Sequence, residues 1–307
     1  MKLGFCLPQM GEAATAEAVR EVAQRAEELG YDSLWVQQRL IRPLQPQTGY
    51  PGSPDGQLPP QYRWVLDPFQ TLTLAAAVTS RIKLGTSIIV FAYHSPADTA
   101  KRVATLDVLS GGRMVFGLGL GWSKDEYDVS GQSFKARAAR QEEYIRALKA
   151  LWGTDPVEFK GKFYTVPRSE VGPKPVQKPH PPIVLATFTP AGMSRAGQLC
   201  QGWHPIAFLP FDTLAQGVQA VRTAAGQAGN DPKSLLFPIR VFPALTEQPI
   251  KDGRMPFQGS LEQLKEDAQR AEEAGITELV IETNFLPDIQ GARDFLRHLE
   301  TFRRLAA

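Results

Sequence analysis

The stretches AEELGYDSLWV (residues 26–36) and AEEAGITELVI (residues 271–281) repeat one pattern near opposite ends of the 307-residue sequence. In each, a helical segment ends at a glycine, Gly30 or Gly275, where a left-handed C-cap favours that residue. A short and mostly apolar segment of strand length follows at once. Helix, glycine and buried strand thus form one repeated unit, which indicates a fold built from alternating helices and parallel strands.

The same alternation fills the sequence between these two stretches. Strands are expected at residues 3–7, in the apolar segment ending at 36, and at 82–90, 114–118, 183–186, 202–206, 235–241 and 278–282, with helices between them. Eight apolar strands separated by amphipathic helices predict a closed (β/α)8 TIM barrel, because helices cover its outer face and side chains fill its interior. An open doubly wound sheet would favour fewer strands and a dinucleotide fingerprint after the first strand, where this chain has LPQMGE.

Two segments depart from the alternation, and neither suggests a second domain. The long loop after the second strand, residues 45–63, is too long for an ordinary connection and indicates a lid. The stretch PVEFKGKFYTV (residues 156–166) predicts a hairpin excursion before the fifth strand, with helices expected on either side at 136–151 and 191–199. We therefore expect one TIM-barrel domain over residues 1–307.

Composition and charge exclude several classes of protein. Lys and Arg number 34 against 32 Asp and Glu, and the signs are interspersed, so nucleic acid is not an expected partner. No secretory leader or membrane-length apolar run is recognisable, so we expect a cytoplasmic protein with no membrane partner. Cys6 and Cys200 suit buried positions better than a disulfide, and no zinc-ligand spacing occurs, so no metal is expected.

In TIM barrels the active site lies at the carboxyl ends of the strands. The residues there include no dominant carboxylate pair, no Ser-His-Asp order and no metal cluster, so a cofactor would have to carry the chemistry. The stretch GLGLGW (residues 117–122) is a weak dinucleotide fingerprint, because Trp122 replaces the last glycine. Its small residues are better explained by the close approach of a planar ligand or of a neighbouring loop.

Three further stretches carry a resemblance to a known family. They are AEELGYDSLWV, the block TSRIKLGTSIIVFAYHSPADTAKRVATLDVLSGGRMVFGLGLGWSKDEY, and PKPVQKPHPPIVLATFTPAGMSRA with the GW that follows. Together they resemble the bacterial luciferase-like monooxygenase superfamily over almost the whole chain. Within it the chain is most similar to the branch of coenzyme F420-dependent oxidoreductases, F420 being a deazaflavin.

The resemblance implies where a cofactor would bind. The ring of the deazaflavin, or alternatively of FMN, would lie in the barrel mouth on a cis peptide at Ser87-Ile88, unless that segment is a plain buried strand. Gly119, Trp122 and Ser123 would lie beside the ring or its ribityl chain, although Trp122 could instead pack a loop. The phosphate end would bind a helix N-terminus, where Thr189 could alternatively serve only as a cap. The residues expected at that end are Thr187, Phe188, Thr189, Ala191, Gly192 and Met193.

The resemblance also implies catalytic and substrate positions, with one departure. The family often carries an acidic residue and a histidine at the end of the second strand, whereas this chain has Gln38-Arg39. Arginine cannot act as a base near neutral pH, but it can hold an anionic ring or a carboxylate. Candidate catalytic residues are therefore Arg39, Gln38, His94 and Glu282. Candidate substrate and lid residues are Gln9, Tyr50, Tyr62, Trp64, His204 and Arg240, each with a structural role as the alternative.

The expected reaction is hydride transfer between reduced F420 and a small organic substrate. Two alternatives remain at this point: an FMNH2-dependent monooxygenase that uses O2, and a catalytically silent flavin-binding homologue. Leu120 stands where bacterial luciferase has an arginine that reaches the FMN phosphate, and this departure counts against FMN. Relatives are often dimers, so a homodimer is also expected.

Overall fold

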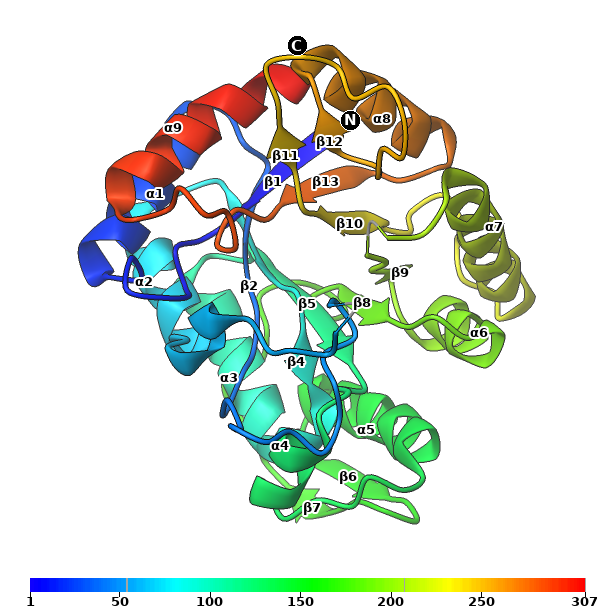
Figure 1. The fold of residues 1–307 in the computed structure, drawn as a ribbon. Helices are drawn as coiled ribbons and strands as arrows, with labels where there is room; N and C mark the ends of the chain where they lie inside the picture. The colour runs from blue at the N-terminus through cyan, green and yellow to red at the C-terminus, as the bar shows by residue number, and fades with distance from the viewer. Residues whose placement is uncertain (54, 207, 307) are drawn as a thin grey trace.

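Eight parallel strands form a nearly closed barrel in the computed structural model, which describes residues 1–53, 55–206 and 208–306. The β9 and β10 segments meet through bridges from Gly202 to Leu236 and from Ile206 to Arg240. The strands follow one another around the barrel in chain order (Figure 1), which confirms the expected TIM barrel. They are β1 (Lys2–Cys6), β2 (Ser33–Val36), β3 (Lys83–Thr86) with β4 (Ile89–Val90), β5 (Met114–Gly119), β8 (Ile183–Ala186), β9 (Gly202–Trp203), β10 (Pro238–Val241) and β13 (Glu278–Ile281).

Helices surround the barrel and cover its outer face (Figure 1). Several begin sharply because a side chain caps the first turn and proline occupies the next position, as at Asp67-Pro68 and Ser95-Pro96. Gly30 and Gly275 have positive φ, as their places after α1 and α8 require. The helices are α1 (Ala16–Glu28), α2 (Pro68–Val78), α3 (Pro96–Leu109), α5 (Arg137–Trp152), α6 (Pro190–Leu199), α7 (Phe211–Gln227), α8 (Leu261–Glu273) and α9 (Ala292–Arg303).

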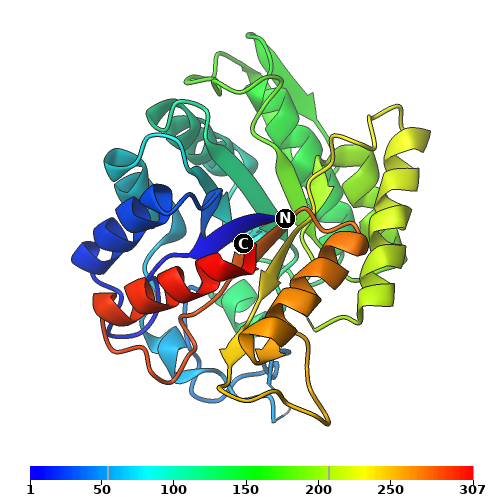
Figure 2. The ribbon, with the colours of Figure 1, turned by 90° about the horizontal axis from the view of Figure 1, so that it is seen from above.

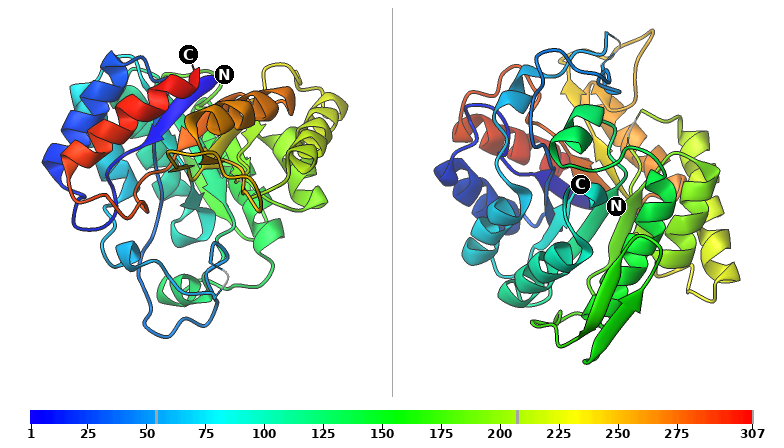
Figure 3. Two further views of the ribbon diagram at one scale, coloured as in Figure 1. Left: turned by 45° about the horizontal axis from the view of Figure 1, so that its top comes forward. Right: turned by 90° about the horizontal axis from the view of Figure 1, so that it is seen from below.

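The additional segments lie at the two ends of the barrel. The expected hairpin is present as antiparallel β6 (Val157–Lys160) and β7 (Thr165–Ser169), and it projects from one end. The lid segment after β2 lies at the other end, beside the loop that carries β11 (Ala244–Leu245) and β12 (Gln258–Gly259), as Figures 2 and 3 show. The lid contains the 3-10 turn η1 (Pro60–Arg63); the turns η2 (Phe91–Tyr93) and η3 (Arg304–Ala306) follow β4 and α9.

The elements differ from expectation in the third and sixth strands of the barrel and in the segment after β5. The strand expected over residues 82–90 is interrupted between Thr86 and Ile89, for reasons given below. A short helix that was not expected, α4 (Lys124–Val129), follows β5, with Ser123 as its N-cap. The strand expected at 202–206 is also shorter, because only Gly202 and Trp203 have strand geometry.

The barrel interior has polar ends and an apolar centre. Its apolar layer consists of Cys6, Trp35, Val115, Val184 and Val280, one residue from each of five strands. The larger core lies outside the barrel, between the strands and the surrounding helices. Charged and amide side chains in the barrel are therefore confined to its two mouths.

Candidate active site

Strand 3 of the barrel carries a bulge at the mouth. Between the paired positions Gly85–Val115 and Ile89–Leu118, the β3–β4 segment has one residue more than β5. The peptide bond Ser87-Ile88 within the bulge is cis, as the family resemblance implied. The Thr86 hydroxyl takes the place of the backbone hydrogen bonds that are missing between the two strands here. Its Oγ1 accepts from Gly117 N at 2.8 Å and donates to Gly117 O at 2.9 Å.

The glycines of β5 accommodate this bulge. A Cβ on Gly117 would collide with the Thr86 carbonyl oxygen, and a Cβ on Gly119 would lie 2.6 Å from Ile88 Cδ1. The stretch GLGLGW is therefore explained by the approach of a neighbouring segment, one of the two interpretations that its small residues allowed. The absence of a side chain at Gly119 therefore leaves room for Ile88 at the bulge.

His204 and Ser87 form a buried pair under the bulge. His204 Nδ1 lies 2.6 Å from the Pro238 carbonyl and so carries the proton, which leaves Nε2 to accept from Ser87 Oγ at 2.7 Å. The imidazole stacks on Trp35 at a centroid distance of 5.3 Å. Burial lowers the pKa of His204 to about 4. The hydrogen bond to the Pro238 carbonyl acts in the opposite direction, and the nearby Arg240 guanidinium lowers the pKa further. His204 is thus a neutral support for Ser87.

Arg240 and Glu282 form an ion pair across the ends of β10 and β13. Arg240 Nη2 lies 2.9 Å from Glu282 Oε2, and Nη1 donates to the Ser87 carbonyl at 3.2 Å. Glu282 Oε1 accepts from the backbone and side-chain nitrogens of Asn284, both at 2.8 Å. Glu282 is therefore fully engaged, whereas buried Arg240 Nε has no hydrogen-bond partner among the residues the structure describes.

Gln38 joins strand 2 to the segment after strand 3. Its Oε1 accepts from Val90 N at 2.9 Å, so its amide nitrogen faces His94 Nε2 at 2.8 Å. His94 Nδ1 then donates toward Asp98, 3.3 Å away. Burial lowers the pKa of His94, and Arg102 adds to the effect. Gln38 and His94 lie together, as expected, but as a neutral hydrogen-bonded pair.

Arg39, at the end of strand 2, has an acidic partner from another segment of the chain. The guanidinium forms an ion pair with Glu126 of α4, and the two side chains are 6% and 0% exposed. Glu126 also accepts from Tyr93 Oη at 2.9 Å and from Leu40 N at 2.6 Å. A carboxylate therefore stands beside the end of strand 2, supplied by another segment. The S-x-x-E pattern of Ser123 and Glu126 is a capping-box signal that could have revealed α4.

The same pair holds the lid in place. The Arg39 guanidinium lies 4.8 Å from the ring centroid of Trp122 and 5.3 Å from that of Tyr62. Tyr50 packs against both rings, at 5.6 and 5.5 Å. Two of these rings pack on Arg39 and Tyr50 packs on both of them, which makes Arg39 an anchor of the lid. Trp64, 56% exposed, takes no part in this cluster.

Gln9 connects the first two strands with the end of the lid. Its Nε2 donates to the carbonyls of Gln37 and Leu66 at 2.6 and 2.7 Å, and its Oε1 accepts from Gln37 N at 2.7 Å. Asn284 Oδ1 accepts from Gln9 N at 3.0 Å. The side chain of Gln9 is thus fully used within the protein.

The segment after β8 provides a helix N-terminus near the mouth. Thr189 caps α6 by accepting from Gly192 N at 3.1 Å, and the Thr187 carbonyl accepts from Trp203 Nε1 at 2.9 Å. A Cβ on Gly192 would collide with the Thr187 hydroxyl, so glycine is needed for this close approach. Phe188 is 60% exposed, and Ala191 is also exposed while Met193 is half-buried. A first helical turn open to solvent, beside a threonine hydroxyl, fits the phosphate end of a cofactor.

Ser123 acts within the protein as a helix cap. Its hydroxyl caps α4 by accepting from Glu126 N at 3.3 Å, and the side chain is buried. Of the expected ring contacts, Ile88 and Trp122 therefore remain the half-buried side chains that line the mouth. Together with the unpartnered Arg240 Nε, the residues present fit a flavin-like group.

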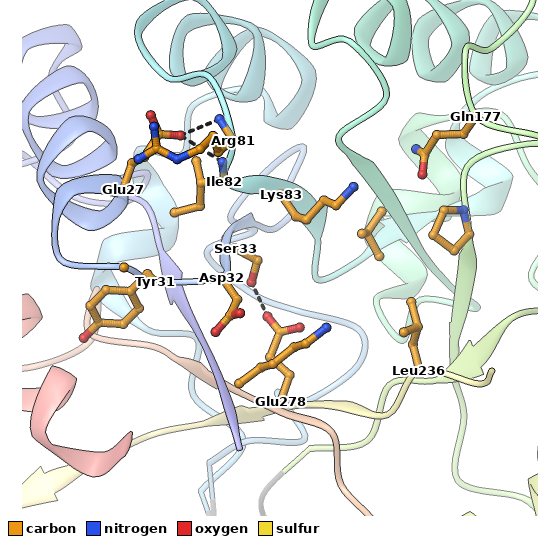
Figure 4. A pocket seen from close by; sticks show the side chains of 14 residues that line it. Glu27, Tyr31, Asp32, Ser33, Arg81, Ile82, Lys83, Gln177, Leu236 and Glu278 are labelled. Atoms are coloured by element: carbon orange, nitrogen blue, oxygen red, sulfur yellow. Dashed lines mark hydrogen bonds between the residues drawn. The ribbon is translucent and has the colours of Figure 1, made fainter. Parts of the chain in front are cut away.

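A separate cavity of about 460 Å³ lies at the amino ends of the strands, opposite the mouth (Figure 4). The Ser33 hydroxyl there donates to Glu278, which also accepts from Trp35 Nε1 at 3.1 Å. Burial raises the pKa of Glu278. Lys2 and Lys83 lie around the opening. This end of a TIM barrel serves stability, so we assign the cavity no part in catalysis.

The described residues form neither a membrane-spanning helix nor a metal cluster. No helix in the described ranges is both long and apolar enough to cross a membrane. Over the same part of the chain, no group of three or more His, Cys, Asp or Glu side chains is placed to hold a metal ion.

Known proteins similar in sequence include characterised and uncharacterised relatives. An uncharacterised protein of Mycobacterium tuberculosis is 34% identical over 209 residues, which cover 67% of this chain and 74% of the relative. The F420-dependent glucose-6-phosphate dehydrogenase of Amycolatopsis mediterranei is 33% identical over 187 residues, covering 60% and 51% of the two chains.

Solved structures share the fold over nearly the full length. The monooxygenase RslO1 from Streptomyces bottropensis has a TM-score of 0.78 at 21% identity, covering 99% of this chain and 98% of its own. The coenzyme F420-dependent tetrahydromethanopterin reductase from Methanopyrus kandleri has a TM-score of 0.77 at 18% identity, covering 99% and 97%. The family model of the luciferase-like monooxygenases matches residues 1–251. With the barrel, the cis bulge and this match together, the chain belongs to the luciferase-like monooxygenase family.

Proposed function

We propose that the protein is an oxidoreductase that uses coenzyme F420 to transfer hydride to or from a small organic substrate at the barrel mouth. The observation that carries this proposal is the cis bulge at Ser87-Ile88, where His204 holds Ser87 and Gly119 leaves room for Ile88. The relatedness to an F420-dependent dehydrogenase favours the deazaflavin over other flavins. When bound, the deazaflavin would supply the hydride-carrying carbon.

The side chains of the mouth have defined tasks in this proposal. Ile88 would support the ring, while Thr187 and the first turn of α6 would hold the phosphate end. Arg240 offers a free N–H donor to an oxygen of the cofactor or substrate. Glu282 holds Arg240, and His204 holds Ser87, so both act by positioning other groups. The lid, anchored on Arg39, would keep water from the mouth.

The described residues of the mouth contain no carboxylate free to act as a base. Glu126 and Glu282 are both buried in ion pairs and accept further hydrogen bonds. This arrangement suits a reaction in which the protein orients the reactants and a cofactor carries the electrons. It also leaves solvent or the substrate as the source of any proton.

An FMNH2-dependent monooxygenase is the second candidate, because the fold of RslO1 is equally similar. The two candidates are separated by titrating the purified protein with F420 and with FMN and following absorbance and fluorescence. We expect micromolar or tighter binding of F420 and much weaker binding of FMN. Tight FMN binding without F420 binding would overturn the proposal. Binding of F420 without turnover of any carbonyl or imine tested would instead support a silent homologue.

A further inference from the structure

A continuous row of aromatic side chains crosses the barrel mouth. Neighbouring rings lie 5.3 to 6.0 Å apart between centroids, and the row joins the segments after β9, β10 and β13 to the lid and the segment after β5. In order, the aromatic row consists of Phe208, Phe242, Phe285, Tyr62, Tyr50 and Trp122. Rings from five separate segments thus converge on one end of the barrel.

The lid accounts for only one half of the aromatic row. Tyr62 and Trp122 pack on Arg39, Tyr50 packs on both of these rings, and the contacts among the three are edge-to-face or tilted. Phe208 and Phe242 contact neither Arg39 nor these three rings in any aromatic or cation–π pair of the described residues. They stack on each other at 5.3 Å with only 11° between their planes. Phe208 is 46% exposed, so a flat apolar face remains open.

The two arginines at the mouth, Arg240 and Arg39, are each paired with a glutamate. The Arg240 guanidinium lies 5.0 Å from the centroid of Phe242, and Glu282 neutralises it. Arg39 is neutralised in the same way by Glu126. Neither arginine is therefore left without a counter-charge that an anionic ligand would supply. Among the described residues, Arg240 Nε and Nη2 have no hydrogen-bond acceptor, and of these two only Nη2 lies in the ion pair with Glu282. A neutral oxygen acceptor such as a carbonyl matches the Nε donor without adding an uncompensated charge.

From this arrangement we infer that the substrate is a flat, conjugated carbonyl compound that bears an aromatic ring. The ring stacks on Phe208, which is exposed and held by its own stacking on Phe242, and the carbonyl oxygen accepts from Arg240. Offset stacking on this face favours a planar ring over a puckered one of the same size. The inference rests on the proposed function and names the substrate class for the same site.

A matched pair of probes tests the ring. 4-Phenyl-3-buten-2-one and 4-cyclohexyl-3-buten-2-one carry the same enone and differ only in a flat or a puckered ring. We expect F420-loaded protein to bind the phenyl compound about fivefold more tightly in calorimetry. Phe242→Leu, which keeps apolar volume but removes the flat ring on which Phe208 stacks, should abolish the preference. Phe163→Leu, at a half-exposed phenylalanine beside the β6–β7 hairpin, should leave it unchanged.

A third probe tests the carbonyl. trans-1-Phenyl-1-butene keeps the flat ring and the double bond but lacks the oxygen, and we expect it to bind about tenfold more weakly than the phenyl enone. Equal binding of the phenyl and cyclohexyl enones, no binding of either, or an equal loss of both in Phe242→Leu would overturn the inference. F420 affinity is measured separately for every variant. The two enones are also titrated into protein without F420. A preference for the phenyl enone there, in a protein that does not bind F420, would refute the proposed function and leave the aromatic recognition standing.

Discussion

The Arg39 guanidinium and the Glu126 carboxylate form an ion pair that is closed off from solvent below the lid. The two residues are far apart in the sequence, and Glu126 reaches the pair from a six-residue helix. The carboxylate also accepts from the backbone of Leu40, the first residue after Arg39. The start of the lid is therefore fixed to α4 as well as to its own strand.

Replacing Arg39 by Ala should destabilise the protein by about 3 kcal/mol, because one member of a buried ion pair would be left unpaired. The rings of Tyr62 and Trp122 would lose the guanidinium on which they pack, so the lid should also be cleaved faster in limited proteolysis. Urea unfolding and the mapping of early cleavage sites within residues 40–63 measure the two effects.

The matched control for Arg39→Ala is Arg146→Ala, which removes an exposed ion pair with Glu142 on α5. Its cost should be at most about 0.5 kcal/mol. Similar losses in the two variants, or an unchanged lid in Arg39→Ala, would contradict the role of Arg39 as an anchor.

Gly119→Ala should weaken F420 binding and lower stability by about 1–3 kcal/mol, because the new methyl group would press on Ile88 at the bulge. Gly226→Ala is the control: this exposed helical glycine has only an ordinary contact with Pro232, and alanine there should stabilise by about 0.5–1 kcal/mol. Thermal unfolding and F420 titration of both variants give the result. Wild-type affinity in Gly119→Ala would show that the bulge does not support the ring.

His204 makes the protein less stable in mild acid. Its pKa of about 4 in the folded state lies below the ordinary histidine value, so the unfolded chain binds the proton more strongly. Stability should therefore fall as the pH drops from about 7 toward 4, and this group alone should account for about 2 kcal/mol between pH 7 and 5. His204→Asn should be less stable than wild type at pH 7, and the gap should narrow by that amount at pH 5. A gap that is constant with pH would mean that the pKa of His204 in the folded protein equals its value in the unfolded chain.

Glu278 should have the opposite dependence on pH. Burial raises its pKa, so the folded protein holds the proton more strongly than the unfolded chain. The stability that Glu278 contributes is fully present below the ordinary glutamate pKa. It is lost as the pH rises through the pKa of Glu278 in the folded protein. Glu278→Gln, which keeps an oxygen for Ser33 and Trp35, should gain stability over wild type as the pH rises from 4 to 8. Glu21→Gln, on the exposed face of α1, should show no such trend, and a parallel trend in both variants would refute the assignment.

Local signals in the sequence were sufficient for most of the fold. The bounds of α2 and α3 follow from a capping side chain before a proline, and the glycines after α1 and α8 mark where those helices end. The break in strand 3 could not be found this way, because it depends on glycines of β5 some thirty positions further along the chain.

The site was harder to predict than the fold, for the same reason. The sequence placed His94, His204, Arg240 and Glu282 at the mouth, and the structure brings them there. Their partners come from distant segments: Ser87 is 117 positions from His204, and Glu126 is 87 from Arg39. Hydrogen bonds and ion pairs between such distant residues determine whether a side chain is available to a ligand. No local sequence pattern predicts them.

Trp35 lies between the two polar ends of the barrel, with its ring against His204 and its Nε1 against Glu278. An indole can donate a hydrogen bond but has no basic lone pair to receive a proton. It therefore cannot serve as a link in a proton relay between the carboxyl group below and the imidazole above. The two ends should titrate independently, and protons consumed at the mouth must exchange with water around the lid.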